Sequence, residues 1–372
     1  MKWCRTCVLP DTRPNLTIGA DGICSACGAF EQRDVIDWQK RQAEFEALVD
    51  SVRCLKRDYD CLVPVSGGKD STWQVVKCLE FGLRPLTVSW RPPARTEIGR
   101  RNLDNLIRLG VDHMDFSIKP SVEAAFMRSA FERAGSSGIP MHFAIFAIPV
   151  NIAVKLEIPL IVWGENSAIE YGGGEDDRNL THLSDDWLSR YGVTQGTRIE
   201  EWYDSNLTER ELRPYTRPDA DVLEDRNIQA VFLGHYFQWD PHTSLSVATA
   251  HGFKASEEGP KTGYYAFADI DDDFISIHHW LKWHKFGFTR LFDNLSLEIR
   301  HGRLSRETAV EFIREEGAKP PTSDISTFCK FTGLSPEAFD AVCEKYRNMD
   351  IWRRVNGIWL IEDFLISDWN WE

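Results

Sequence analysis

The hexapeptide Ser66-Gly67-Gly68-Lys69-Asp70-Ser71 carries the clearest chemistry in this sequence, because it follows the apolar run 61–65 and opens a predicted helix. Adjacent glycines permit positive φ angles and let backbone N–H groups face an anion. The helix start adds unpaired N–H groups and a favourable dipole. With the hydroxyls of Ser66 and Ser71 and the charge of Lys69, this pattern predicts a pyrophosphate site, in which Lys69 and Asp70 are the catalytic candidates. The spacing matches neither the Walker loop nor the dinucleotide fingerprint.

Two cysteine pairs near the N-terminus form a second chemical pattern. Sixteen residues separate Cys4 and Cys7 from Cys24 and Cys27, a spacing typical of structural zinc sites. Four thiolates complete tetrahedral zinc and leave no open position, while an iron–sulfur cluster uses the same ligands and is the alternative. We expect residues 1–30 to be a small unit held together by this metal.

The elements that position these motifs alternate between strand and helix. Apolar runs predict strands at residues 61–65, 84–90, 113–118, 160–163 and 228–237, with a buried helix at 140–156 that Pro149 should kink. Such alternation indicates an α/β fold with a doubly wound parallel sheet, whose ligand lies beyond the carboxyl ends of the strands. Residues 1–57 are the metal segment and a helical connector, 58–275 the ATP-binding domain, and 276–372 an aromatic, then helical, C-terminal region. Residues 167–227 are acidic and poor in apolar runs, so we expect an insertion outside the core.

Polar residues directly after the fourth predicted strand are candidates for substrate contact. They are Glu165, Asn166, Glu170 and Tyr171. A simple polar turn is the alternative, although functional side chains gather on loops at strand ends. The segment 278–288 mixes bases with aromatics and fits either a packed stripe with a basic rim or a binding surface. Single histidines such as His113, His142 and His235 are more often packed than catalytic.

Composition and charge narrow the class of protein. The chain has 372 residues and a net charge of −14, which argues against a general nucleic-acid binder. No apolar run approaches the roughly 18 residues that span a bilayer, and the first residues lack the apolar core of a signal peptide. We therefore expect a cytoplasmic protein without membrane contact, whose cysteines do not form a disulfide framework.

The hexapeptide resembles the PP-loop of the N-type ATP pyrophosphatases, which include asparagine synthetases, NAD synthetases and tRNA-modifying enzymes and belong to the adenine nucleotide alpha hydrolase-like fold. Over nearly its full length, the chain resembles the N-acetyl sugar amidotransferases of bacterial surface-polysaccharide and nonulosonate biosynthesis. That resemblance rests on the cysteine pairs, the phosphate loop, 164–166 with 170–173, 233–237 with 239–240, 285–288, and on Arg290, Asp293, Ser296 and 299–303. His235 stands where the family pattern leads us to expect an aromatic residue.

The resemblance implies that ATP and Mg²⁺ adenylate the acetamido oxygen of an N-acetylated sugar, which can be nucleotide-activated, and that ammonia then displaces AMP to give an acetamidino group. It also implies substrate roles for Lys285, Arg290 and Asp293. A glutaminase similar to that of histidine biosynthesis is the implied partner. The residues agree with an external ammonia source, because Cys54, Cys61, Cys78, Cys329 and Cys343 lack the glycine-flanked elbow of a glutaminase nucleophile.

Two other functions remain open at this point. One is a PP-loop tRNA-modifying enzyme, for instance a thiolase, against which the acidic charge and the 167–227 insertion weigh. The other is a non-catalytic zinc-bearing scaffold, against which the intact Gly67–Asp70 loop weighs.

Overall fold

Five parallel strands form the central sheet, as the alternating pattern predicts. The computed structural model describes residues 1–164, 166, 170, 172–173 and 180–371. The strands are β1 (Cys61–Pro64), β2 (Pro85–Trp90), β3 (Asp112–Phe116), β4 (Leu160–Trp163) and β5 (Gln229–Phe232), in the order β3-β2-β1-β4-β5. Because β2 and β4 flank β1, the strand order reverses beside the carboxyl end of β1, where doubly wound sheets bind ligands.

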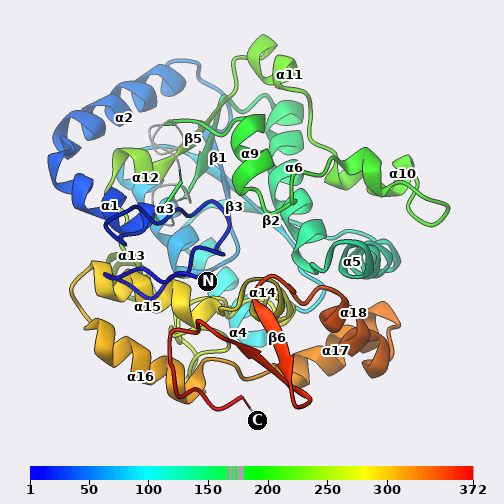
Figure 1. Cartoon of the computed structure of the whole chain (residues 1–372). Helices are drawn as coiled ribbons and strands as arrows, with labels where there is room; N and C mark the ends of the chain where they lie inside the picture. The colour runs from blue at the N-terminus through cyan, green and yellow to red at the C-terminus, as the bar shows by residue number, and fades with distance from the viewer. Residues whose placement is uncertain (165, 167–169, 171, 174–179, 372) are drawn as a thin grey trace.

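Helices cover both faces of this sheet (Figure 1). Successive strand residues point to opposite faces, so Leu62 packs in one core and Val63 in the other. The first core includes α5 (Pro120–Ala134) and α6 (Gly138–Leu156). The second includes α2 (Trp38–Arg53), α3 (Lys69–Glu80) and α4 (Glu97–Ile107), and α13 (Pro241–Ala250) packs on α3. Both faces are therefore buried at the inner strands, which explains why β1, β2 and β4 lack a polar face, whereas the edge strand β3 is largely exposed.

The buried helix predicted at residues 140–156 is confirmed as α6. By length and composition it is apolar enough to cross a membrane, with a mean hydropathy of 1.6 in an 18-residue window of its 19 residues. It packs against β1, β2 and β4, however, and residues such as Ala144 and Val150 are fully buried there. The helix also continues through Pro149 to Leu156. Its apolar composition is thus explained by packing on the sheet.

The segment 180–227 is not the peripheral insertion that its composition suggests. It contains α9 (Asp185–Tyr191), η2 (Ile199–Trp202), α10 (Glu209–Leu212), η3 (Arg213–Tyr215) and α11 (Ala220–Asp225). Trp187, Trp202 and Tyr215 are buried in the same core as α5 and α6. Large apolar side chains placed singly among polar residues supply this burial, so no apolar run marks it.

The structure differs from the sequence prediction at the fifth strand and at the C-terminus. The predicted fifth strand stops at Phe232, and Leu233–Tyr236 form a one-turn helix, α12. The C-terminal region is helical in α14 (Ile275–Phe286), α15 (Arg290–Arg300), α16 (Arg306–Glu316), α17 (Thr322–Thr332) and α18 (Pro336–Lys345), but it ends in a hairpin of β6 (Trp352–Val355) and β7 (Ile358–Ile361). Asn356 and Gly357 form the two-residue turn with φ angles of 51° and 91°. Asn-Gly is the preferred pair for such a turn, so this hairpin was predictable.

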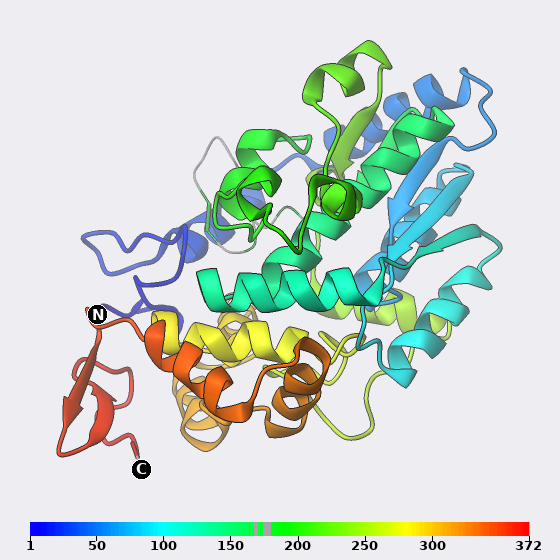
Figure 2. The same ribbon diagram turned by 90° about the vertical axis from the view of Figure 1, so that its right-hand side faces the viewer.

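The N-terminal segment lies against the C-terminal hairpin (Figure 2). It leads through α1 (Ser25–Glu31) and η1 (Gln32–Val35) to α2. The Trp3 indole donates to the Asp363 carbonyl at 2.7 Å, and its ring packs edge-on against Phe364. The two ends of the chain therefore share one hydrophobic core.

Candidate functional site

The phosphate loop has the backbone geometry that its glycines predict. Gly67 has a φ of +89°, and a Cβ atom there would lie 2.6 Å from the Leu103 backbone nitrogen. Gly68 caps α3 with extended backbone, and its N–H donates to the Ser66 hydroxyl at 3.3 Å. The Ser71 hydroxyl donates to the Gly68 carbonyl at 3.1 Å. The amide groups at the start of α3 therefore remain available to an anion.

Lys69 and Asp70 are held by each other and by an aromatic neighbour. The Lys69 ammonium lies 2.5 Å from one Asp70 carboxylate oxygen, and the Trp239 indole donates to the other at 2.9 Å. Lys69 is 5% exposed and also lies over the rings of Trp239 and Phe267. This clamp fixes one positive and one negative charge at the mouth of the loop.

Two cavities adjoin the loop. The larger, of about 450 Å³, runs along the carboxyl ends of four strands and is lined by Ser66, Ser71, Gln74, Trp90, Trp163 and Phe232 among others. The smaller, of about 200 Å³, is lined by Gly68, Lys69, Asp70, Arg290 and Asn294 among others. An aromatic-lined space beside a small charged one matches the shape and polarity of a nucleoside next to its phosphates.

Three aspartates that the sequence reasoning missed face the loop. Asp269 and Asp271 line both cavities, and Asp272 lines the larger one. Asp271 accepts a hydrogen bond from Ser66, and burial raises its pKa. Burial also raises the pKa of Asp272 to about 7. The signal was available, because Asp269-Ile270-Asp271-Asp272-Asp273 is a dense acidic run.

The carboxylates around the small cavity fit magnesium. Asp70, Asp269 and Asp271 all line it. Mg²⁺ prefers oxygen ligands and usually binds one or two carboxylates together with substrate phosphates. These residues would hold the ion between the loop and the acidic run, where it would neutralise charge on a bound phosphate group.

A third cavity, of about 610 Å³, opens beside the two cavities that adjoin the loop. We call the third one the cationic cavity and the other two the nucleotide cavities. The basic residues that line the cationic cavity come from four parts of the chain and are Arg13, Arg190, Lys282, Lys285 and Arg290. It shares His142, Tyr191, Val193, Asp269 and Ile275 with the larger nucleotide cavity. Asp269 lines all three cavities and accepts from Arg290 at 2.9 Å. The nucleotide and cationic cavities thus meet at Asp269.

Asp293 organises the basic side chains of this cavity. It is fully buried and accepts from Arg13 at 2.8 Å and from Lys282 at 3.0 Å. Despite its burial, these cations hold the pKa of its carboxyl far below the usual range. Lys285 instead donates to the Ala134 carbonyl at 3.2 Å, and burial lowers its pKa to about 8. Lys285 and Arg290 therefore line the cavity, whereas Asp293 positions other residues from behind.

The described substrate-contact candidates after β4, Asn166 and Glu170, lie outside the three cavities. Glu165 and Tyr171 lie outside the described residues. Asn166 accepts from the Trp187 indole at 3.1 Å, and buried Glu170 pairs with Arg33; neither Asn166 nor Glu170 lines the three cavities. His235 is buried on α12, where burial lowers its pKa to about 4, and it also lies away from these cavities.

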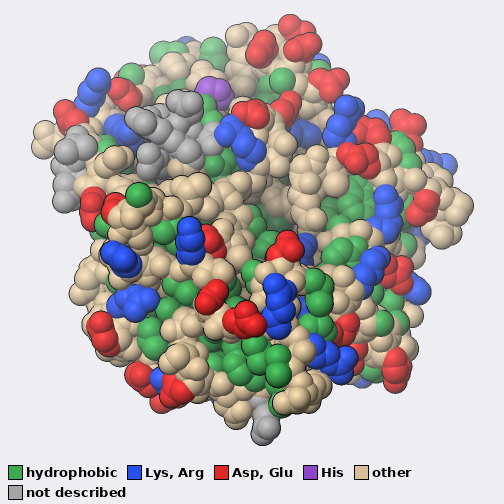
Figure 3. Space-filling model, viewed as in Figure 1, with side chains coloured by type: hydrophobic (Ala, Val, Ile, Leu, Met, Phe, Trp, Pro, Cys, Tyr) green, Lys and Arg blue, Asp and Glu red, His purple; other side chains and the backbone are tan. Residues whose placement is uncertain are grey.

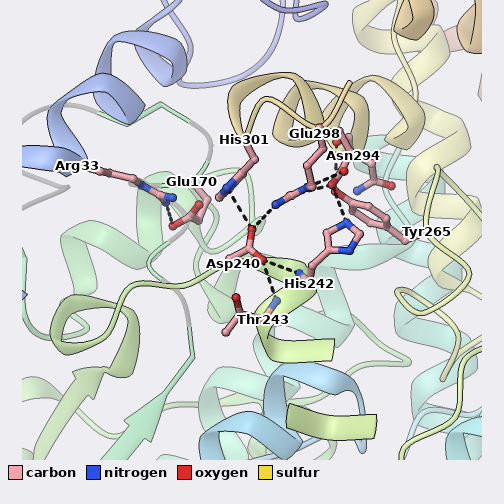
Figure 4. Close-up of polar contacts among 10 residues, drawn as sticks. Arg33, Glu170, Asp240, His242, Thr243, Tyr265, Asn294, Glu298 and His301 are labelled. Carbon is pink, nitrogen blue, oxygen red and sulfur yellow. Dashed lines mark hydrogen bonds and ion pairs between the residues drawn. The ribbon is translucent and has the colours of Figure 1, made fainter. Parts of the chain in front are cut away.

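A polar network connects the C-terminal helices to the phosphate-loop domain (Figure 4). Asp240 caps α13 by accepting from two backbone N–H groups, and it also accepts from Arg303 at 2.8 Å and pairs with His301 at 3.1 Å. Glu298 on α15 accepts from Arg303 and from the Tyr265 hydroxyl. Since Trp239 directly precedes Asp240, this network sets the position of α15 relative to the Asp70 clamp.

The four N-terminal cysteines converge as their spacing predicts. Their sulfur atoms lie within 4.8 Å of one another, with Cys4–Cys27 at 4.0 Å and Cys7–Cys24 at 3.7 Å. Tetrahedral zinc with Zn–S bonds of about 2.3 Å places sulfurs roughly 3.8 Å apart, so the cluster fits this ion. Arg306 donates to the Cys7 carbonyl at 3.0 Å, and Thr12 to the Phe286 carbonyl at 2.6 Å. The cluster therefore fixes the loop that carries Arg13.

Comparisons with known proteins match part of the chain. Residues 259–364 match a family model described as the C-terminal domain of WbpG-like LPS biosynthesis proteins. The matched segment contains the acidic run and helices α14 and α15. A search of curated proteins finds no match. Among solved structures, NMN synthetase from Francisella tularensis is 15% identical over 52% of this chain and 92% of that chain, with a TM-score of 0.29. At that score, the fold assignment rests on the sheet topology of this chain.

Proposed function

We propose that this protein is an ATP-dependent amidotransferase of surface-polysaccharide biosynthesis that converts the acetamido group of an anionic N-acetylated sugar into an acetamidino group. The observation that carries this proposal is the junction at Asp269, where the nucleotide cavities adjoin a cavity with five basic side chains. An ATP α-phosphate and a sugar amide can approach each other there. The LPS-biosynthesis description of the matched C-terminal model supports the substrate class.

The proposed chemistry has two steps. An amide carbon is a poor electrophile and its oxygen a poor leaving group. Attack of the amide oxygen on the α-phosphorus releases pyrophosphate and makes AMP the leaving group; ammonia then adds to the carbon and AMP departs. Amides at the start of α3, Lys69 and Arg290 stabilise the phosphates, because preorganised donors act strongly in a site shielded from water. Magnesium on the aspartates adds charge neutralisation when bound.

The basic cavity favours an acidic or nucleotide-activated sugar. Arg290 pairs with Asp269, Arg13 and Lys282 pair with Asp293, and Arg190 pairs with Asp186. Five cations thus meet three carboxylates, so positive charge is in excess. A carboxylate or diphosphate on the substrate would pair with Lys285 and Arg190 while the acetamido group points toward Asp269. A neutral sugar would offer no negative charge to these cations in a partly buried site.

Nitrogen arrives as ammonia from a separate glutaminase in this proposal. All nine cysteines are described, and four are claimed by the metal cluster. Cys61 lies in β1, Cys78 in α3, Cys329 in α17 and Cys343 in α18, so none of these four stands at a strand-to-helix turn. Cys54 follows α2 on the surface.

The test supplies ATP, magnesium and candidate N-acetylated sugars with either glutamine or an ammonium salt. Mass spectrometry should show oxygen replaced by NH in the sugar with ammonium, and no product with glutamine alone. Turnover by the isolated chain with glutamine alone would overturn the partner. A tRNA-modifying role would instead require stable tRNA binding, whereas acidic and basic side chains are interspersed over the face in Figure 3.

A further inference from the structure

One histidine stands where the nucleotide cavity and the cationic cavity adjoin. His142 is the fifth residue of α6 and lines both spaces. Of the five residues that the two cavities share, Val193 and Ile275 are apolar, Tyr191 carries a phenol, and Asp269 is paired with Arg290. His142 is therefore the neutral nitrogen base of the junction.

Its backbone contact fixes which ring nitrogen carries the proton. His142 Nδ1 lies 2.7 Å from the Gly138 carbonyl oxygen, four residues earlier in the helix. A carbonyl oxygen only accepts hydrogen bonds, so Nδ1 is the donor and Nε2 keeps its lone pair in the neutral ring. Among the described residues, Nε2 has no hydrogen-bond partner.

The surroundings keep this ring neutral at physiological pH. Burial, aided by the charge of Lys282, lowers the pKa of His142 to about 4, against the opposing effect of the Gly138 carbonyl. His278, whose ring centre lies 6.0 Å away, and His279 are titratable neighbours, and burial lowers the pKa of both. A base that is already deprotonated can accept a proton without first losing one.

We propose that Nε2 of His142 accepts the proton that ammonia must lose after it attacks the adenylated amide. This assignment rests on the proposed function. Ammonia forms a C–N bond to the protonated imidate carbon and gives a tetrahedral adduct bearing a C–NH₃⁺ group. His142 takes one proton from that group. The nitrogen lone pair then forms the C=N bond as the C–O bond to AMP breaks, which leaves AMP, an amidinium group and imidazolium; the imidazolium proton passes to solvent.

The decisive variant is His142→Gln, which keeps a polar side chain but has no basic nitrogen. Two rates are compared: sugar-dependent ATP–pyrophosphate exchange, which reports adenylation, and amidine formation with ammonium. Amidine formation should fall about 100-fold or more, as expected for loss of a general base, while exchange falls far less. Hydroxylamine should restore much of the lost rate, because its less basic adduct gives its proton to water.

His251→Gln is the matched control. His251 makes the same kind of bond, with Nδ1 2.9 Å from the Val247 carbonyl four residues earlier, but it is exposed at the end of α13. It should retain both rates and the wild-type preference for ammonia over hydroxylamine. If His142→Gln is poorly folded, His142→Ala with added imidazole replaces it, and imidazole should restore amidine formation.

Three possible results distinguish failure of the His142 assignment from failure of the proposed function. Unchanged amidine formation in His142→Gln would overturn the assignment. Parallel loss of both rates, with rescue by neither hydroxylamine nor imidazole, would also overturn it and indicate a role in binding or packing. Absence of sugar-dependent exchange in the wild-type protein would instead refute the proposed function, and the role of His142 with it.

Discussion

The phosphate loop and the cationic cavity are built in opposite ways. Six consecutive residues, which follow β1 and run into the first turn of α3, supply the loop, and its contacts are mostly local. The basic lining of the cavity comes from the N-terminal segment, α9, α14 and α15. One buried carboxylate in α15, Asp293, accepts from Arg13, which lies 280 positions earlier in the chain. The loop is therefore formed by neighbouring residues, whereas the proposed sugar site forms only when distant segments of the chain pack together.

The largest effect should come from the loop itself. Lys69→Ala removes a buried cation beside the small cavity. We expect a loss of about 100- to 1000-fold in turnover, the usual cost of removing one preorganised electrostatic contact. Thermal unfolding should change little, because Asp70 keeps its bond from Trp239. Lys77→Ala, on the same helix but paired with Glu80, is the control. Equal losses in the two variants would contradict a special role for Lys69.

Loss of the metal should damage the cavity and spare the loop. The purified chain should contain one zinc ion, and Cys27→Ser should lose it. Amide hydrogen exchange should then rise first in residues 1–30, while the strands remain protected, and the sugar KM should rise because Arg13 is no longer fixed. Cys54→Ser, an exposed thiol, should match the wild type. Metal analysis that finds neither zinc nor iron would refute the site.

Arg13 isolates the contribution of the N-terminal segment. Arg13→Gln removes one cation from the lining and one partner of Asp293. The sugar KM should rise about 10-fold or more, since hydrogen bonds to charged groups contribute roughly 1.5–3 kcal/mol. The ATP KM should stay near the wild-type value. Arg5→Gln, an exposed change in the same segment, is the control. A rise in the ATP KM instead would show that the two cavities are not separate in function.

The smallest effect is a pH dependence from Lys285. Burial lowers its pKa to about 8, so the ammonium is present below this pH and is lost as the pH rises through it. Binding of an anionic sugar should therefore weaken a few-fold above about pH 8, visible as a bend in log kcat/KM for the sugar. Lys285→Arg, which stays charged, should remove the bend. A bend that persists in this variant would assign it to another group.

The sequence predicted the locally determined parts well. The existence of all five strands, the parallel sheet and the convergence of the four cysteines are confirmed, although the fifth strand is shorter than predicted. These features depend on apolar runs, glycines and spacing within short segments. Predictions failed where burial came from isolated side chains, as for Trp187 and Trp202 in segment 180–227. The Asn356-Gly357 hairpin was missed although its turn signal is present.

The cationic cavity could be predicted only in part. The family resemblance pointed to Lys285, Arg290 and Asp293, which gather around it. Arg13, Arg190 and His142 lack a local motif, because their roles arise only when distant segments fold together. Asn166 and Glu170 follow a strand end as expected, yet their side chains are buried against Trp187 and Arg33. Position after a strand therefore does not by itself place a side chain in the site.

Identification of the nucleotide products tests the central claim most directly. The wild-type chain is incubated with ATP, magnesium, an ammonium salt and an acidic N-acetylated sugar, and the nucleotides are separated by chromatography. The account predicts AMP and pyrophosphate in equal amounts, matched by sugar in which NH has replaced oxygen. Formation of ADP and phosphate would contradict it, because cleavage would then fall between the β- and γ-phosphates and the sugar oxygen would not carry AMP.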